Sequence, residues 1–295
     1  MLSKRRLKLV LRSDAGAIDI YDALTNPLKL AIWFCNKADI NLKLRGHVKI
    51  EGENCAATSF PEKAIKGTII DLDPNRRIKY TWPISGVDTE VVWEVYDKGR
   101  HCNVVLTHAR VPEKSLMMDA WIIYLYNLQA FLKTGRPIYR FDYKRIDKRT
   151  VKREIFIEKL PPVIWKALTD QEALRGWFAE GAEVDPQVGG NYLSGWKDKN
   201  GKPAGPTEIA ELVENRKLVY GWKFSGEGKS GDQVTWELTR IGEKTRVNLK
   251  HSGFDPERNN KDYAQGWHAY VLKLKDFCER RGRISFQVLD GDWSV

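Results

Sequence analysis

Two collinear copies of one residue pattern run through this chain of 295 residues. Trp33-Phe34 in the first half matches Trp177-Phe178 in the second half, and His108 matches His251. Further aromatic pairs keep the same order, and the offset between partners drifts only from 140 to 146 residues. These pairs are Tyr80/Tyr220, Trp82/Trp222, Trp93/Trp236, Trp121/Trp267 and Tyr124/Tyr270. A long period in two copies predicts duplicated globular domains rather than a solenoid of short repeats.

The second copy begins with a strand and two short helices. Residues 152–158 alternate between the two faces of a strand, and Pro161-Pro162 ends the strand and begins a helix. Thr169 or Asp170 can cap a second short helix over residues 171–176. From Glu183 on the period changes to two, which predicts about six consecutive strands.

The rest of the second copy is predicted as strands followed by one long helix. The clearest strands are expected at 205–213, 217–224, 232–240 and 244–251, with a hairpin turn at 199–202. A loop over 255–260 follows, in which Asn260 is a candidate helix cap. Apolar residues recur at helical spacing from Tyr263 to Phe277 and predict a helix with one apolar face.

The first copy repeats this order, with a strand over 5–12, helices within 16–34 and a long helix over 113–133. Consecutive strands joined by short turns predict an antiparallel sheet, and the long helix covers one of its faces. We therefore expect an α+β fold in both copies. The predicted divisions are a divergent first domain (1–133), a basic linker (134–150), a second domain (151–282) and a C-terminal tail (283–295). The tail either packs across the partner domain or forms a flexible end.

Charge and cysteine content narrow the function classes. The net charge is +10, but +5 of it lies in residues 1–12 and +4 in residues 134–150, so both domain bodies are near neutral. Nucleic acid is therefore not an expected partner, because such binders carry their charge across a folded face. No apolar run approaches the ~20 residues of a membrane span. The four cysteines form no CxxC pair, which indicates reduced thiols in a cytoplasmic protein without a metal site.

The motifs of the second copy resemble one family over nearly all of residues 151–281. They run from Val163-Ile164-Trp165-Lys166-Ala167-Leu168-Thr169-Asp170 through Trp177-Phe178, Val188-Gly189-Gly190 and Leu218-Val219-Tyr220-x-Trp222 to Val234-Thr235-Trp236-Glu237-Leu238, Leu249-x-His251-Ser252-Gly253-Phe254 and Gly266-Trp267. The pattern is similar to that of the START/Bet v 1-like (SRPBCC) superfamily, in its activator of Hsp90 ATPase homologue 1-like branch. The first copy departs from it, since it lacks the Gly-Gly turn and has Ala109-Arg110 after its histidine.

The resemblance implies tandem helix-grip domains, in which a curved antiparallel sheet surrounds a long C-terminal helix and leaves an apolar cavity. Some relatives bind lipids, phenolics or polyketides, some are cyclases, and one branch stimulates the Hsp90 ATPase. The eukaryotic co-chaperone also carries a separate N-terminal chaperone-binding domain, which this sequence does not resemble. Fold alone does not choose among these activities.

The candidate cavity residues are the aromatic and histidine side chains that the two copies share. Rings of this kind either stack on a flat apolar ligand or fill the core, and core packing is the more common role. In the second copy they are Trp177, Tyr220, Trp222, Trp236, His251, Trp267 and Tyr270. Their first-copy equivalents are Trp33, Tyr80, Trp82, Trp93, His108, Trp121 and Tyr124.

Four polar residues near these rings also have a predicted role. His251 and His108 are either polar anchors or general bases for a ligand, or histidines that a backbone carbonyl satisfies. His268 follows Trp267 by one residue and is expected to face about 100° away from it, in solvent. Alternation along the strand places Glu237 on the face opposite Trp236.

The leading hypothesis is a non-catalytic, cytoplasmic protein that binds a small hydrophobic or aromatic molecule between sheet and long helix. No catalytic motif, metal-ligand spacing or cofactor fingerprint occurs in the sequence, so we expect no cofactor and no catalytic residue. One alternative is an Hsp90-ATPase-activator-like co-chaperone or another protein-interaction module. The other is an enzyme of the polyketide aromatase/cyclase type.

Overall fold

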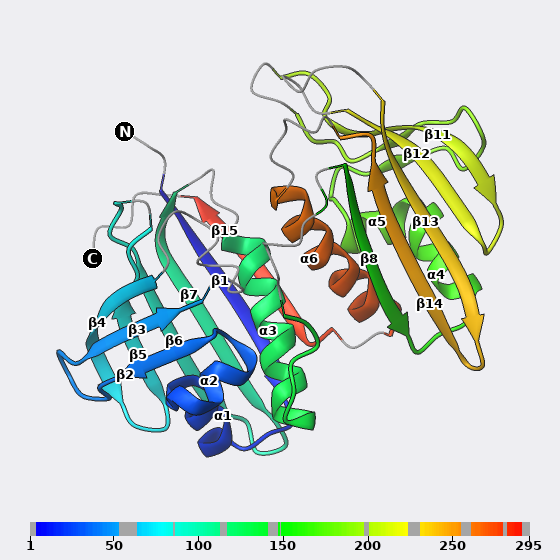
Figure 1. Ribbon diagram of the computed structural model, residues 1–295. Coiled ribbons are helices and arrows are strands. Elements are labelled where there is room, and N and C mark those ends of the chain that lie inside the picture. The colour runs from blue at the N-terminus through cyan, green and yellow to red at the C-terminus, as the bar shows by residue number, and fades with distance from the viewer. Residues whose placement is uncertain are drawn as a thin grey trace. The chain divides into compact units, whose positions relative to one another are not determined.

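The computed structural model describes residues 4–52, 64–84, 86–112, 117–140, 147, 149–197, 201–223, 231–254, 261–279 and 282–290. The chain forms two compact units (Figure 1). The first unit consists of residues 1–144 together with 283–295, and the second consists of residues 145–282. The α+β class predicted from the repeat is confirmed in both units, because each combines an antiparallel sheet with two short helices and one long helix.

The first unit contains one eight-stranded antiparallel sheet in the order β15-β1-β7-β6-β5-β4-β3-β2. Two short helices follow the first strand, and the long helix α3 follows β7 (Figure 1). The elements are β1 (Lys4–Ser13), α1 (Ala17–Thr25), α2 (Pro27–Trp33), β2 (Lys37–Ile40), β3 (His47–Glu51), β4 (Ala64–Asp73), β5 (Arg77–Thr81), β6 (Glu90–Asp97), β7 (Cys102–Pro112), α3 (Met117–Thr134) and β15 (Ile284–Asp290).

The second unit repeats the same order around a five-stranded sheet, β11-β12-β13-β14-β8, and a separate pair, β10-β9. The strands predicted from Glu183 on are confirmed within one residue at each end. The elements are β8 (Thr150–Ile157), α4 (Pro161–Thr169), α5 (Gln171–Trp177), β9 (Glu183–Val184), β10 (Tyr192–Leu193), β11 (Gly205–Val213), β12 (Lys217–Lys223), β13 (Asp232–Ile241), β14 (Lys244–Ser252) and α6 (Lys261–Cys278).

The junction between the two short helices is built in the same way in both units. Asn26 ends α1 and its side-chain oxygen accepts a hydrogen bond from the Leu28 backbone N–H at 3.0 Å. Asp170 does the same between α4 and α5, where it accepts from the Ala173 N–H at 2.8 Å. Each side chain satisfies a donor that the first turn of the second helix would otherwise leave open.

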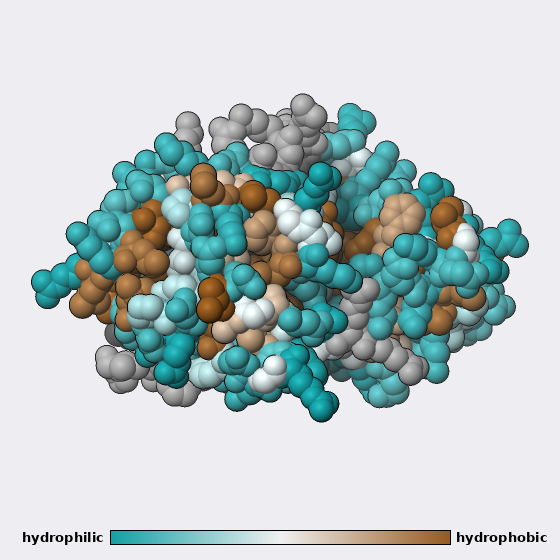
Figure 2. All heavy atoms as spheres, turned by 90° about the horizontal axis from the view of Figure 1, so that it is seen from below, coloured by the Kyte–Doolittle hydropathy of each residue, from teal (hydrophilic) through white to brown (hydrophobic). Residues whose placement is uncertain are grey.

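Alternation along the strands sets the core-facing residues. In β13, Val234, Trp236 and Leu238 are buried while Glu237 is exposed, so the expected position of Glu237 opposite Trp236 is confirmed. A few large apolar side chains remain on the surface, with Leu28 at 80% and Ile18 at 69% exposure. Hydrophobic and hydrophilic residues are interspersed on the face shown in Figure 2. Within the described chain, no helix is long and apolar enough to cross a membrane.

The expected exposure of His268 is wrong. His268 is only 5% exposed, although it points away from the face that carries Trp267. Arg153 on β8 donates to the backbone carbonyl of Ala264, one turn before His268, so α6 is covered along this side as well as on its sheet-facing side. Burial, with a smaller contribution from the Arg153 charge, lowers the pKa of His268 well below its usual value. The prediction assumed that α6 has one buried face, but α6 is also covered by β8 on the side of His268.

The C-terminal tail forms the edge strand β15 of the first unit's sheet. It runs antiparallel to β1, in a register from Arg5 opposite Asp290 to Leu11 opposite Ile284. The Arg12 backbone N–H donates to the Arg283 carbonyl at 2.8 Å, and the Arg283 guanidinium lies 3.0 Å from the Asp14 carboxylate. The tail therefore covers the outer edge of β1 and is not a flexible end over residues 283–290.

The corresponding edge of β8 in the second unit is covered differently. The Lys275 ammonium of α6 donates to the Phe156 carbonyl at 2.6 Å, and Glu279 accepts from the Glu158 backbone N–H at 2.8 Å. Side chains of α6 and of the residue that follows it thus satisfy edge groups of this strand, where β15 pairs with β1 in the first unit. The predicted cap Asn260, the loop 255–260 and part of the hairpin turn at 199–202 lie outside the described residues.

Candidate functional site

The shared aromatic residues form hydrogen bonds that are the same in both units. Trp33 donates from its indole N–H to the Ala23 carbonyl at 3.0 Å, and Trp177 donates to the Ala167 carbonyl at 2.8 Å. Each bond ties the end of the second short helix to the first one. Because an indole N–H is only a donor, burying it without an acceptor would be costly, and the fold supplies a carbonyl at the same place twice.

A second bond joins two strands of the sheet. Trp93 donates to the Tyr80 hydroxyl, and Trp236 donates to the Tyr220 hydroxyl, at 3.1 Å in both units. Tyr220 and Trp236 are at most 1% exposed, and burial raises the pKa of Tyr220 above its usual value. The phenol therefore stays neutral and acts as an acceptor for the indole.

Replacing Tyr220 by Phe should destabilise the second unit by about 1–3 kcal/mol, because the buried Trp236 N–H loses its acceptor. Chemical denaturation measures the loss of stability. Amide hydrogen exchange in β12 and β13 then shows whether the loss lies in the second unit. Tyr80→Phe is the matched variant and should have a similar effect on the first unit. Unchanged stability in both variants would contradict a structural role for this bond.

The third shared bond fixes the tautomer of the histidine. The Trp121 N–H donates to Nδ1 of His108, and the Trp267 N–H donates to Nδ1 of His251, at 2.9 Å in both units. Since the indole can only donate, Nδ1 must be the unprotonated nitrogen, and the imidazole proton lies on Nε2. Both histidines are fully buried.

The two units differ at the group that faces Nε2. In the first unit it is the Thr89 hydroxyl, 2.7 Å from Nε2 of His108, and this hydroxyl donates in turn to the Trp82 carbonyl. Each polar side-chain atom in this series of hydrogen bonds has a partner while His108 is neutral. Burial lowers the pKa of His108 to about 3. The matching residue of the second unit is Asp232, whose Oδ2 lies 3.8 Å from Nε2 of His251.

Asp232 is a site residue that the sequence analysis missed. It lies four residues before Trp236, as Thr89 lies four residues before Trp93, so an alignment of the two copies pairs these two positions. Asp232 is 7% exposed and places a carboxylate next to the His251 imidazole, where the first unit has the Thr89 hydroxyl next to His108.

The histidine geometry limits the chemistry available. A general base must offer a lone pair to the proton that it removes. The lone pair of His251 lies on Nδ1 and accepts the Trp267 N–H, while Nε2 carries a proton and faces Asp232. This arrangement suits a structural histidine or a buried charged pair, and it does not present a base to a ligand.

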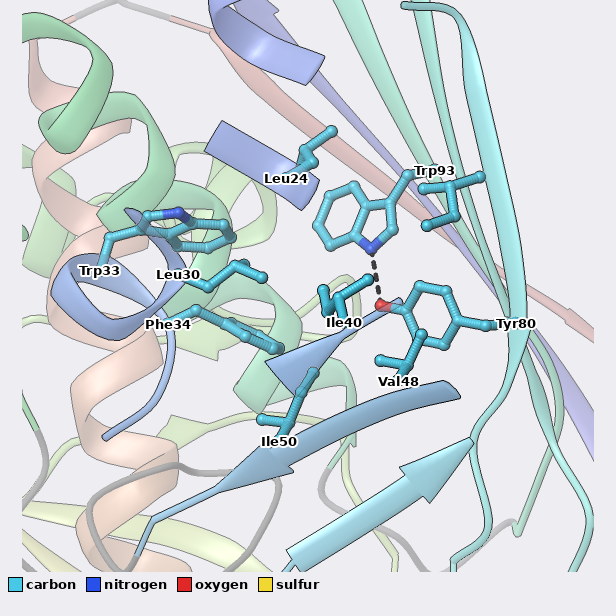
Figure 3. A pocket seen from close by; sticks show the side chains of 10 residues that line it. Leu24, Leu30, Trp33, Phe34, Ile40, Val48, Ile50, Tyr80 and Trp93 are labelled. Atoms are coloured by element: carbon cyan, nitrogen blue, oxygen red, sulfur yellow. Dashed lines mark hydrogen bonds between the residues drawn. The ribbon is translucent and has the colours of Figure 1, made fainter. Parts of the chain in front are cut away.

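A cavity beside Trp33, Tyr80 and Trp93 of the first unit is very small. Its volume is about 10 Å³, which is about one water molecule. Figure 3 shows Trp33 and Phe34 on one side of this cavity, and the hydrogen-bonded pair Trp93 and Tyr80 on the other. Its lining residues are Leu24, Leu30, Trp33, Phe34, Ile40, Val48, Ile50, Ile78, Tyr80 and Trp93.

The second unit contains half-buried rings at one end of its aromatic set. Trp196 and Tyr270 are half-buried, and their ring centroids lie 6.1 Å apart. Phe178 lies 5.3 Å from Trp196 and 5.2 Å from Tyr270, and Trp222 lies 5.9 Å from Trp196. Tyr124, the first-unit equivalent of Tyr270, is only 3% exposed. Among the described residues, this group of rings is therefore partly exposed in the second unit, while Tyr124 of the first unit is buried.

Trp196 was not identified from the sequence as a candidate, because no residue of the first copy matches it. Tyr192, which stacks on Tyr220 at 4.4 Å and donates to the Leu168 carbonyl, was missed for the same reason. All the predicted candidates of each unit do lie in one connected set of rings. Their role in binding a ligand stays a prediction.

Comparison with known proteins identifies the relatives of the chain. The family model described as "Activator of Hsp90 ATPase homolog 1-like protein" matches it twice, over residues 14–133 and 160–279. No curated protein matches the sequence.

Solved structures give the following similarities. DynU16, a protein of the dynemicin biosynthetic locus, is 15% identical over 93% of this chain and 99% of its own, with a TM-score of 0.39. The Aha1 dimer from Colwellia psychrerythraea is 20% identical over 44% of this chain and 96% of its own, with a TM-score of 0.37. The di-domain ARO/CYC BexL of the BE-7585A biosynthetic pathway is 13% identical over 94% of this chain and 98% of its own, with a TM-score of 0.35.

Proposed function

Since this chain belongs to the activator of Hsp90 ATPase homologue 1-like family, we propose that its second domain binds a small apolar or aromatic molecule without catalysing a reaction. The molecule would enter between the sheet and α6, beside Trp196, Trp222 and Tyr270. The observation that carries this proposal is the pair of half-buried rings, Trp196 and Tyr270, which lie against buried rings of the same set. Aromatic faces of this kind stack on flat apolar ligands and bury much of their surface.

The first domain is proposed to have a structural role. Its equivalent rings are closed, its cavity holds about one water, and its histidine is fully satisfied by Trp121 and Thr89. Opening such a core would expose apolar surface and break these bonds, at a cost that a small ligand would have to offset. One ligand per chain is therefore expected.

A neutral aromatic probe, N-phenyl-1-naphthylamine, tests the proposal by fluorescence titration of the full chain. Trp196→Leu and Tyr270→Leu should each weaken binding at least about tenfold, because stacking rings are replaced by side chains with less flat surface. Phe156→Leu is the matched control, since Phe156 is 44% exposed on the outer side of β8. Equal affinity for the control and the two ring variants, or two probes bound per chain, would contradict the proposal.

The family description favours one alternative, a protein-interaction module that acts on an Hsp90-type chaperone. A several-fold rise in the ATPase rate of a purified Hsp90 on addition of the full chain would support it, and an unchanged rate would count against it. A cyclase is less well supported, because the lone pair of His251 is held by Trp267. A cytoplasmic location agrees with the buried, reduced thiols of Cys102 and Cys278, and cell fractionation would test it.

A further inference from the structure

A groove on the second unit lies outside the aromatic set. It is formed by α4, α5 and the end of α6, and its volume is about 570 Å³. Figure 1 shows these three helices in the same unit. Most of its lining is apolar, and Val163 and Phe277 are 43% and 38% exposed. The lining residues are Pro162, Val163, Lys166, Ala167, Glu172, Ala173, Phe277 and Cys278. Both the volume and the apolar lining are typical of small-molecule sites.

The charges at this groove are not balanced. Glu172 pairs with Arg175, whose guanidinium lies 2.8 Å from the carboxylate. Lys166 is exposed on α4 and has no ion pair or hydrogen bond through its ammonium among the residues that the structure describes. The groove therefore presents one uncompensated positive charge beside an apolar surface.

The first unit shows what the same positions do when they are paired. Asp22 and Lys29 occupy the positions of Lys166 and Ala173, and they form an ion pair of 2.5 Å that joins α1 to α2. In the second unit a lysine replaces the aspartate and an alanine replaces the lysine. The ion pair is lost, and the charge that remains has the opposite sign to Asp22.

We propose that this groove binds a medium-chain fatty acid, with the carboxylate on Lys166 and the acyl chain along Val163, Ala173 and Phe277. The ammonium supplies the charge complement of a single carboxylate. The rest of the lining is mainly apolar, so the groove complements an acyl chain that ends in one carboxylate. This site is separate from the aromatic set, and the inference does not rest on the function proposed above.

Titration calorimetry of the full chain with decanoate, below its micelle concentration, tests the inference. One decanoate should bind per chain. Lys166→Gln should weaken binding at least about fivefold, because a charge-assisted contact is lost, while Lys250→Gln, at another exposed lysine, should leave it unchanged. Decanol should bind more weakly than decanoate, and decyltrimethylammonium should not bind. Ala173→Phe, which fills the groove, should abolish binding of decanoate and leave the affinity for N-phenyl-1-naphthylamine unchanged.

Equal affinity of Lys166→Gln and the unaltered chain for decanoate would overturn the inference. So would loss of N-phenyl-1-naphthylamine binding together with decanoate binding in Ala173→Phe, because both probes would then share one site. Circular dichroism of each variant establishes that it is folded, and Lys166→Gln, an exposed substitution, keeps the test valid if Ala173→Phe does not fold. If the protein bound phosphatidylglycerol vesicles but not free decanoate, the groove would be assigned to a lipid surface. That result would also overturn the inference.

Discussion

A chain that ends at Gly282 should lose much of the stability of its first unit while the second unit keeps its own. The deletion removes β15, whose seven residue pairs cover the outer edge of β1, and it removes the Arg283–Asp14 ion pair. Each backbone hydrogen bond contributes about 0.5–1.5 kcal/mol net, so we expect a loss on the order of 2–4 kcal/mol after the ordering of the strand is discounted. The melting temperature of the first unit should fall by roughly 5–15 °C.

Amide hydrogen exchange resolves which unit is affected. Protection should fall in β1 and β7 and remain unchanged in β13 and β14, because β15 belongs to the first unit alone. The newly open edge of β1 should also promote self-association, which sedimentation velocity would detect. The matched control is a chain that ends at Asp290 and retains β15. Equal protection in the two truncated chains would show that the tail strand contributes nothing to the first unit.

Acidification should destabilise the first unit through His108. Its pKa in the folded protein is about 3, below the 6.5 of an unburied histidine, so the unfolded state takes up the proton first. The stabilisation that comes from keeping His108 neutral in the folded state is fully present above about pH 6.5. It is lost as the pH falls toward 3, at about 1.4 kcal/mol for each pH unit. Protonation would place a second N–H on Nδ1, directly against the Trp121 N–H.

His108→Gln provides the comparison for this prediction. The variant should be less stable than the parent at neutral pH and should show a shallower fall in stability between pH 6 and pH 4, measured by denaturation at each pH. In the second unit the Asp232 carboxylate lies 3.8 Å from the imidazole and supplies a negative charge to a protonated ring. Asp232→Thr, which copies Thr89 of the first unit, should make the second unit more sensitive to acid. Parallel pH profiles for the parent and His108→Gln would exclude His108 as the cause.

The features that the sequence determined are those with a local or repeated signal. The two copies, the order of their elements and the inward-facing residues of each strand follow from periodicity, since alternation at two and 3.6 residues directly reports which side faces the core. The repeat also indicated that Trp93, Tyr80, Trp236 and Tyr220 belong to shared positions of the fold, and the structure adds that each Trp donates to its Tyr. The identity of the rings that share a core was therefore predictable, although their hydrogen bonds were not.

Tertiary structure alone decided the features that depend on residues far apart in the chain. The tail joins β1 across the whole sequence, from Arg5 to Asp290, and no local period signals which edge a strand will meet. His268 is buried because β8 runs along a second side of α6, which a helical pattern does not encode. Asp232 became a candidate site residue only because the fold places it beside His251. Lys166 became one because it lacks an ion pair like that of Asp22 with Lys29 in the first unit. Periodicity fixes which face a residue lies on, but charge balance and edge pairing depend on which segments meet, and only the folded chain brings those segments together.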